Sequence, residues 1–150
     1  MATSTLVPPT GRAHAVPSHP QLRRHRRDVV RWALAHGHRL DRDALAVLVS
    51  VRADGSGQLS SRWTSDHVAR VLWSDVPIWC SSHGVRLPGD VHSTLTTYLR
   101  YLSSHRRLEP GSDPIATLRR AVEDHRPGRN SARARHPAAG GAPAPVLPIS

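Results

Sequence analysis

The prolines of this chain gather at its two ends and so limit where it can fold. Of the 13 prolines in 150 residues, four lie in residues 1–21 and five in residues 127–150. The C-terminal stretch is also rich in alanine and glycine and has no hydrophobic period. Such segments cannot bury enough apolar surface to offset the entropy lost on ordering. The sequence therefore predicts a disordered arm at 1–21, a folded domain at 22–126 and a disordered Pro/Ala/Gly-rich tail at 127–150.

Apolar residues within the predicted domain recur at the spacing of an α-helix. A first helix is expected over Leu22–His36, before Gly37, because glycine commonly ends helices. A second helix should run from a cap at Asp41 to about Val51. The apolar run ALAVLVSV in this second segment would also suit a buried strand.

The third predicted helix begins at Thr64 or Ser65, where a side-chain oxygen can cap the free backbone N–H groups. It should kink or restart at Pro77, because proline clashes with the preceding turn. Its apolar stripe consists of Val68, Leu72, Val76 and Trp79.

Two more helices complete the predicted domain. The fifth helix has Ser112 or Asp113 as its cap and Pro114 in its first turn. The apolar positions of the fourth and fifth helices are Val91, Leu95, Tyr98, Leu99 and Leu102, then Ile115, Leu118 and Val122. Five helices with short connections predict an all-α bundle.

The positive charge of the chain lies mainly on its flanks. All 21 Lys+Arg residues are arginine, against 11 Asp+Glu, for a formal net charge of +10. Residues 1–27 hold five arginines and residues 127–150 hold three, with no acid in either segment. Basic flanks on a nearly neutral core are typical of proteins that contact phosphates, although a GC-rich genome also produces such a composition without function. The densest run supplies the predicted nucleic-acid contacts, Arg23, Arg24, Arg26 and Arg27.

The residue types that are missing exclude several chemistries. Without lysine there is no Walker-type, Schiff-base or kinase-type lysine. A single cysteine excludes an intramolecular disulfide and a Cys-rich zinc site. The longest apolar run, Ala44–Val49, is far shorter than the ~20 residues that span a bilayer. We therefore expect a cytoplasmic protein that is not an enzyme, has no membrane span, and uses no cofactor, metal or small-molecule substrate.

Residues 52–63, RADGSGQLSSRW, resemble an EF-hand calcium loop in part. The residues that match the loop pattern are Asp54, Ser56, Gly57 and Leu59. The first ligand position is Arg52 and the twelfth is Trp63, so both anionic ends of the calcium site are missing. We expect a glycine-rich turn between helices here.

The segment Trp63–Pro88 resembles the excisionase-type helix-turn-helix. Comparable places are occupied by Thr64, Val68, Ala69, Leu72, Trp79, Gly84, Leu87 and Pro88. The spacing from Val68 to Trp79 is shorter than in that family, and no tight turn separates two helices. The resemblance implies that a second helix would enter the DNA major groove. Against this, Ile78–Cys80 is expected to belong to the core, and Asp75 would repel phosphate.

Residues Trp63–His125 also resemble a helical module of uncharacterised proteins from GC-rich actinobacteria. The shared features are the WT start, the VPxWC segment, a following proline-led helix and the GSDP-x3-LR segment at Gly111–Arg119. This resemblance implies an all-α fold and an actinobacterial source, and it implies no biochemical activity. Small basic proteins of this kind also occur on actinobacterial plasmids as transfer or copy-control accessories.

Two aromatic residues fall off the predicted core stripes, Trp73 and Tyr101. If they are exposed, they could stack on bases or fill a pocket of a protein partner. For Trp73, packing under a neighbouring helix is the equally weighted alternative.

Two hypotheses about function remain. The first is a small basic accessory protein, of a plasmid or other mobile element, that contacts nucleic acid through its flanking arginines. The second is a helical protein–protein interaction module, such as an accessory factor in plasmid transfer or spread, with no nucleic-acid contact.

Overall fold

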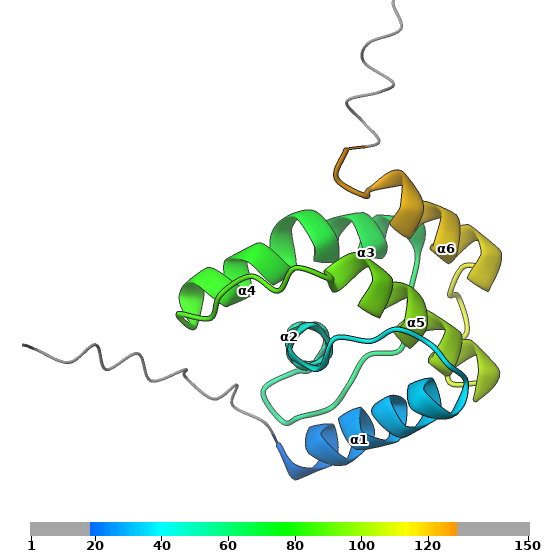
Figure 1. The fold of residues 1–150 in the computed structure, drawn as a ribbon, viewed down its shortest axis with the longest axis horizontal. Coiled ribbons are helices and arrows are strands. Elements are labelled where there is room, and N and C mark those ends of the chain that lie inside the picture. Colours follow the sequence, from blue (N-terminus) through cyan, green and yellow to red (C-terminus); the bar gives the residue numbers. More distant parts are fainter. Residues whose placement is uncertain (1–18, 129–150) are drawn as a thin grey trace, which may run out of the picture.

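The computed structural model describes residues 19–128, and these residues form an all-helical bundle (Figure 1). The bounds of the helices are α1 Pro20–Ala35, α2 Arg42–Arg52, α3 Ser65–Arg70, the π-helical turn η1 Val71–Asp75, α4 Val76–Ser82, α5 Val91–Ser104 and α6 Ile115–Asp124. Because α3, η1 and α4 form one continuous helical run, the described residues contain five helices. The predicted all-α fold is confirmed. Of the segments expected to be disordered, 1–21 and 127–150, residues 1–18 and 129–150 lie outside the described residues, whereas Pro20 and Gln21 belong to α1.

The first helix begins at Pro20, two residues before the predicted start. Proline suits the first turn of a helix, because its missing N–H would have no partner there. The ring of His19 caps this end, accepting a hydrogen bond at Nδ1 from the backbone N–H of Gln21 at 3.4 Å. Leu22 is buried, so the start of α1 belongs to the folded domain.

Helix α2 forms the centre of the bundle and contacts α1, η1, α4 and α5 (Figure 1). All six residues of Ala44–Val49 are buried. A helix that is apolar all round is typical of a core surrounded by other elements. The segment that would also have suited a buried strand is therefore a central helix, with the Asp41 carboxylate capping it as predicted.

Two buried threonines on α5 hold the connection between α1 and α2. Thr94 Oγ1 accepts a hydrogen bond from the backbone N–H of Asp41 at 3.0 Å. Thr97 Oγ1 donates to the backbone carbonyl of Arg39 at 2.7 Å. Because a buried carbonyl or N–H without a partner is costly, these hydroxyls set the path of the connection across α5.

The segment before α3 pairs with the segment before α6. Glu109 N donates to the carbonyl of Ser61 at 3.1 Å, and Asp113 N donates to the carbonyl of Trp63 at 2.8 Å. The side chain of Ser112 accepts from Trp63 N at 3.1 Å, and Asp113 Oδ2 accepts from Ser65 N at 2.7 Å. The prediction that Ser112 or Asp113 caps α6 is therefore wrong. Both side chains serve the start of α3, and Pro114 takes the cap position of α6 without a side-chain hydrogen bond.

The helical run from α3 to α4 passes through Pro77 without a restart. The irregularity lies just before the proline, where Val76 N donates to the carbonyl of Val71 and closes a π-helical turn. A widened turn accommodates a residue whose ring would clash with the carbonyl four residues earlier. The segment Ile78–Cys80 was expected to belong to the core, and this is only partly correct. Cys80 is buried, but Trp79 is half-buried and Ile78 is 64% exposed.

Among residues 19–128, no helix is long and apolar enough to cross a membrane.

Candidate nucleic-acid interface

An open groove runs between α1 and the first half of α2. Its lining consists of Pro20, Arg23, Arg26, Arg27, Val30, Arg31 and Leu34 from α1 and Arg42, Asp43, Leu45 and Ala46 from α2. Residues three and four apart share one face of a helix, which places Arg23, Arg26 and Arg27 together on the groove side. Five of the eleven lining residues are arginine and one is acidic.

The structure brings together three of the four arginines that the sequence predicted as contacts. Arg23, Arg26 and Arg27 line the groove, whereas Arg24 does not. Arg24 is exposed and lies one residue, or about 100°, around the helix from Arg23.

Sequence reasoning missed two groove arginines, Arg31 and Arg42. The position of Arg31, four residues after Arg27, was a usable signal, because that spacing keeps a residue on the same helix face. No local signal could have found Arg42, because it comes from a different helix.

Few carboxylates neutralise the groove arginines. Arg31 lies 3.8 Å from Asp28 in an exposed ion pair. Among the described residues, Arg23, Arg26, Arg27 and Arg42 form no ion pair. Burial, together with the neighbouring charge of Arg23, lowers the pKa of the Arg26 guanidinium. The groove therefore concentrates positive charge that the protein itself leaves largely uncompensated.

The floor of the groove is apolar between these charges. Val30 is half-buried and Leu34 is 70% exposed, and α2 adds the buried Leu45 and Ala46. An apolar floor with an arginine rim can hold the long alkyl stems of the arginines while their guanidinium groups reach solvent.

The two candidate aromatic contacts have different surroundings. The Trp73 side chain is 57% exposed, and its Nε1–H donates to Nδ1 of His125 at 3.1 Å. Tyr101 is only 2% exposed, so it does not meet the condition of exposure for an aromatic contact. Its ring packs edge-on against Trp32, at a centroid distance of 5.7 Å, and against His25, at 5.8 Å. Because α1, α2 and α6 all contact α5, its buried face is wider than one apolar stripe.

His25 of α1 contacts helix α5. His25 Nε2 and Tyr98 Oη lie 3.0 Å apart in a hydrogen bond. Burial lowers the pKa of His25, and the positive charge of Arg107 lowers it further, against a smaller opposing effect of Asp28. The surroundings therefore favour the neutral form of His25.

The half-buried His25 predicts that the protein loses stability in mild acid. Because its pKa is lower in the folded chain than the ordinary 6.5, the unfolded chain binds more protons below about pH 6.5. The free energy of unfolding should fall as pH drops from 6.5 through the folded pKa, by at most about 1.4 kcal/mol per pH unit for this one histidine. Urea unfolding between pH 7.5 and 5 measures this slope, and the His25→Gln variant should reduce it. The pKa of His67 is also lowered, so His67 contributes to the same slope and some slope should remain in the variant. A slope that does not change at all in His25→Gln would contradict the role assigned to His25.

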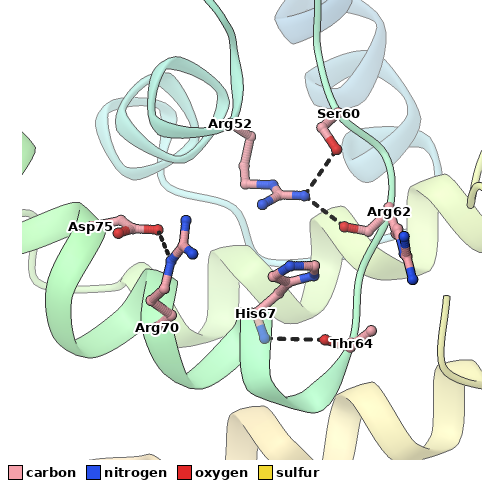
Figure 2. Close-up of polar contacts among 7 residues, drawn as sticks. All are labelled: Arg52, Ser60, Arg62, Thr64, His67, Arg70 and Asp75. Atoms are coloured by element: carbon pink, nitrogen blue, oxygen red, sulfur yellow. Dashed lines mark hydrogen bonds and ion pairs between the residues drawn. The ribbon is translucent and has the colours of Figure 1, made fainter.

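The loop that resembles a calcium site is closed by an arginine instead (Figure 2). Arg52 Nη2 donates to Ser60 Oγ at 3.1 Å and to the carbonyl of Arg62 at 2.6 Å. Its guanidinium carbon lies 4.7 Å from the centre of the Trp63 ring. Asp54 Oδ1 accepts three hydrogen bonds within the turn, from Ser56 N, Ser56 Oγ and Gln58 N. Arg52, which occupies the first ligand position of a calcium loop, thus joins the two ends of this loop through its guanidinium group.

Comparison of the chain with protein-family models, with curated proteins and with solved structures finds no match. In the segment that resembles an excisionase-type helix-turn-helix, Ser65–Ser82 is one continuous helical run, without a turn between two helices. The fold and the groove together define a small helical protein with a basic groove between its first two helices.

Proposed function

We propose that this protein binds nucleic acid by contacting phosphates with the arginines of the α1–α2 groove. The observation that carries the proposal is that Arg23, Arg26, Arg27 and Arg42 line one groove and form no ion pair among the described residues. Arginine suits this task, because its planar guanidinium binds a phosphate through two parallel hydrogen bonds. Because small basic proteins of this kind occur on actinobacterial plasmids, we propose that the protein is an accessory protein of a plasmid or other mobile element.

The length of the arginine face fits a short stretch of backbone. Arg23 and Arg31 are eight residues apart, which corresponds to about 12 Å along a helix. Phosphates of a DNA duplex lie close together, one per about 1.7 Å of its axis when both strands are counted, so a face of this length can contact more than one phosphate. Contacts of this kind position a protein on nucleic acid without reading its sequence.

The test is a salt titration of binding to a random-sequence DNA duplex, using the full chain. The variant Arg23→Gln/Arg26→Gln/Arg27→Gln should weaken binding about tenfold or more at moderate salt and should lower the slope of log K against log salt by about three. Substitution is preferable to truncation at residue 28, because α1 begins at Pro20 and Leu22 is buried.

A matched control removes the same charge elsewhere. Arg86, Arg119 and Arg120 are exposed and do not line the groove. The variant Arg86→Gln/Arg119→Gln/Arg120→Gln should keep nearly the full slope. Equal losses in the two triple variants would mean that only total charge matters, and no binding by the unsubstituted chain at 50 mM salt would overturn the proposal.

The second candidate, a protein-interaction module, is favoured by the apolar side chains that remain exposed. Leu34 is 70% exposed at the groove, and Trp73, Ile78 and Leu87 are each more than half exposed. If the duplex does not bind, a pull-down with full chain and with Leu34→Ser and Trp73→Ala variants tests this function. A partner that is retained by the full chain and lost in one of these variants would support it.

A further inference from the structure

A second group of basic side chains gathers where α2 ends and α3 begins (Figure 2), and none of its residues lines the α1–α2 groove. Arg52 is the last residue of α2, and His67 and Arg70 lie on α3, three residues apart and therefore on one face. In Figure 2 the guanidinium groups of Arg52 and Arg70 and the His67 ring border the same space. Arg62 is also near this group. Its guanidinium packs against Gly111, because a Cβ added to Gly111 would lie 3.5 Å from Arg62 Nε.

The positive charges in this group act on one another. Burial lowers the pKa of His67, and the charges of Arg52, Arg70 and Arg62 lower it further, against the opposing effect of Asp66. The carboxylate of Asp75 bonds directly to this group, accepting a hydrogen bond at Oδ2 from Arg70 Nε at 3.2 Å. Among the described residues Arg52 forms no ion pair, and its Nη2 is used by neutral oxygens of the loop. Two other acids act on the group without an ion pair to it, Asp66 near His67 and Glu109 near Arg52.

Two nitrogens in this group are buried without a hydrogen-bond partner. They are Nε of Arg52 and Nδ1 of His67. A buried polar atom without a partner costs about 1–3 kcal/mol, and more when the group is charged. Such atoms are rare in folded proteins, and an ion or water that binds them is one of the explanations for them.

We propose that the space bordered by Arg52, His67 and Arg70 binds a phosphate group. A tetrahedral phosphate brings negative charge to two guanidinium groups and offers several acceptor oxygens to N–H donors. The ring of His67 can donate an N–H to it. The Arg70 side chain is 65% exposed, so this long side chain can move to admit the anion from solvent. The site uses no residue of the α1–α2 groove and does not depend on the function proposed above.

The same phosphate chemistry can come from inorganic phosphate or a phosphomonoester, or from the backbone of a nucleic acid. The first arm of the test therefore adds inorganic phosphate to the full chain at constant ionic strength. Thermal unfolding is the measurement that reports binding. A ligand that binds only the folded state raises Tm with concentration. We expect a rise of several degrees over chloride for the unsubstituted chain and loss of most of that rise in Arg70→Gln.

Three further variants serve as controls or comparisons in this arm. Arg86→Gln removes an exposed arginine elsewhere and should keep the full rise, which separates binding from the general stabilising effect of phosphate salts. Asp75→Asn releases Arg70 from its ion pair and should strengthen phosphate binding several-fold. The triple variant of the α1 arginines should also keep the rise, so this proposal and the proposed function can fail separately.

The second arm uses an oligonucleotide without a terminal phosphate, so that only backbone phosphates are available. If inorganic phosphate gives no Arg70-dependent shift but oligonucleotide binding falls several-fold in Arg70→Gln and not in Arg86→Gln, the site is a backbone-phosphate site and the proposal stands. Equal responses of the Arg70 and Arg86 variants in both arms would overturn it.

Discussion

Replacing Trp63 with alanine should lower the free energy of unfolding by about 3–5 kcal/mol, which is the usual cost of removing a buried tryptophan. Trp63 is 0% exposed and is among the largest fully buried side chains of the described domain. Its ring meets Tyr98 edge-on at a centroid distance of 6.4 Å and lies under the Arg52 guanidinium. Since small domains are stable by only 5–15 kcal/mol, this loss would be a large part of the total.

Urea unfolding followed by far-UV circular dichroism measures this effect, because each substitution removes one of the four tryptophans and so changes the fluorescence signal itself. Trp73→Ala is the matched control, and we expect a loss below about 1 kcal/mol because the Trp73 side chain is 57% exposed. Similar losses for the two variants would contradict the burial of Trp63. Trp63→Phe should cost clearly less than alanine, because it keeps a ring and removes an indole N–H that is buried without a partner.

Replacing Asp113 with alanine should lower the free energy of unfolding by about 2 kcal/mol. Asp113 Oδ2 accepts hydrogen bonds from Ser65 N at 2.7 Å and from Ser65 Oγ at 3.0 Å. The carboxylate thereby supplies the start of α3 with an acceptor from a segment 48 residues away. Its loss leaves a half-buried N–H unpaired and weakens the join between the two segments.

Asp113→Asn separates the hydrogen bonds from the charge, because the amide oxygen can still accept from Ser65. We expect it to lose less than half as much stability as Asp113→Ala, as measured by the urea midpoint. If asparagine and alanine cost the same, the negative charge would be the main contribution. A shift of neither midpoint would show that the contact between these segments contributes little to stability.

Most of the helices could be read from the sequence, because their signals are local. Asp41 and Thr64 cap α2 and α3 as predicted, since a cap needs only its own side chain and the next three residues. Gly37, with φ of +65°, follows the end of α1 for the same local reason. The choice between strand and helix for Ala44–Val49 was not local, because both would be buried.

The candidate sites were less accessible to sequence reasoning. The run of arginines at the start of α1 was visible, but its division into groove residues and Arg24 required the helix to be packed. Arg52 and His67 gave no signal, because each is an isolated basic residue in the sequence. Tyr101 was misjudged, since a helix that is covered from several sides buries residues beyond one stripe.

Backbone periodicity, capping and proline placement are interactions within one or two helical turns, and these are sufficient to specify every helix except α2. Contacts between distant segments follow a different rule. The use of Ser112 and Asp113 at the start of α3, the meeting of Arg42 with the α1 arginines, and the approach of Arg70 to Arg52 exist only after the helices pack. Packing decides them because a side chain with two possible partners takes the one that the burial of the whole core brings within hydrogen-bond distance.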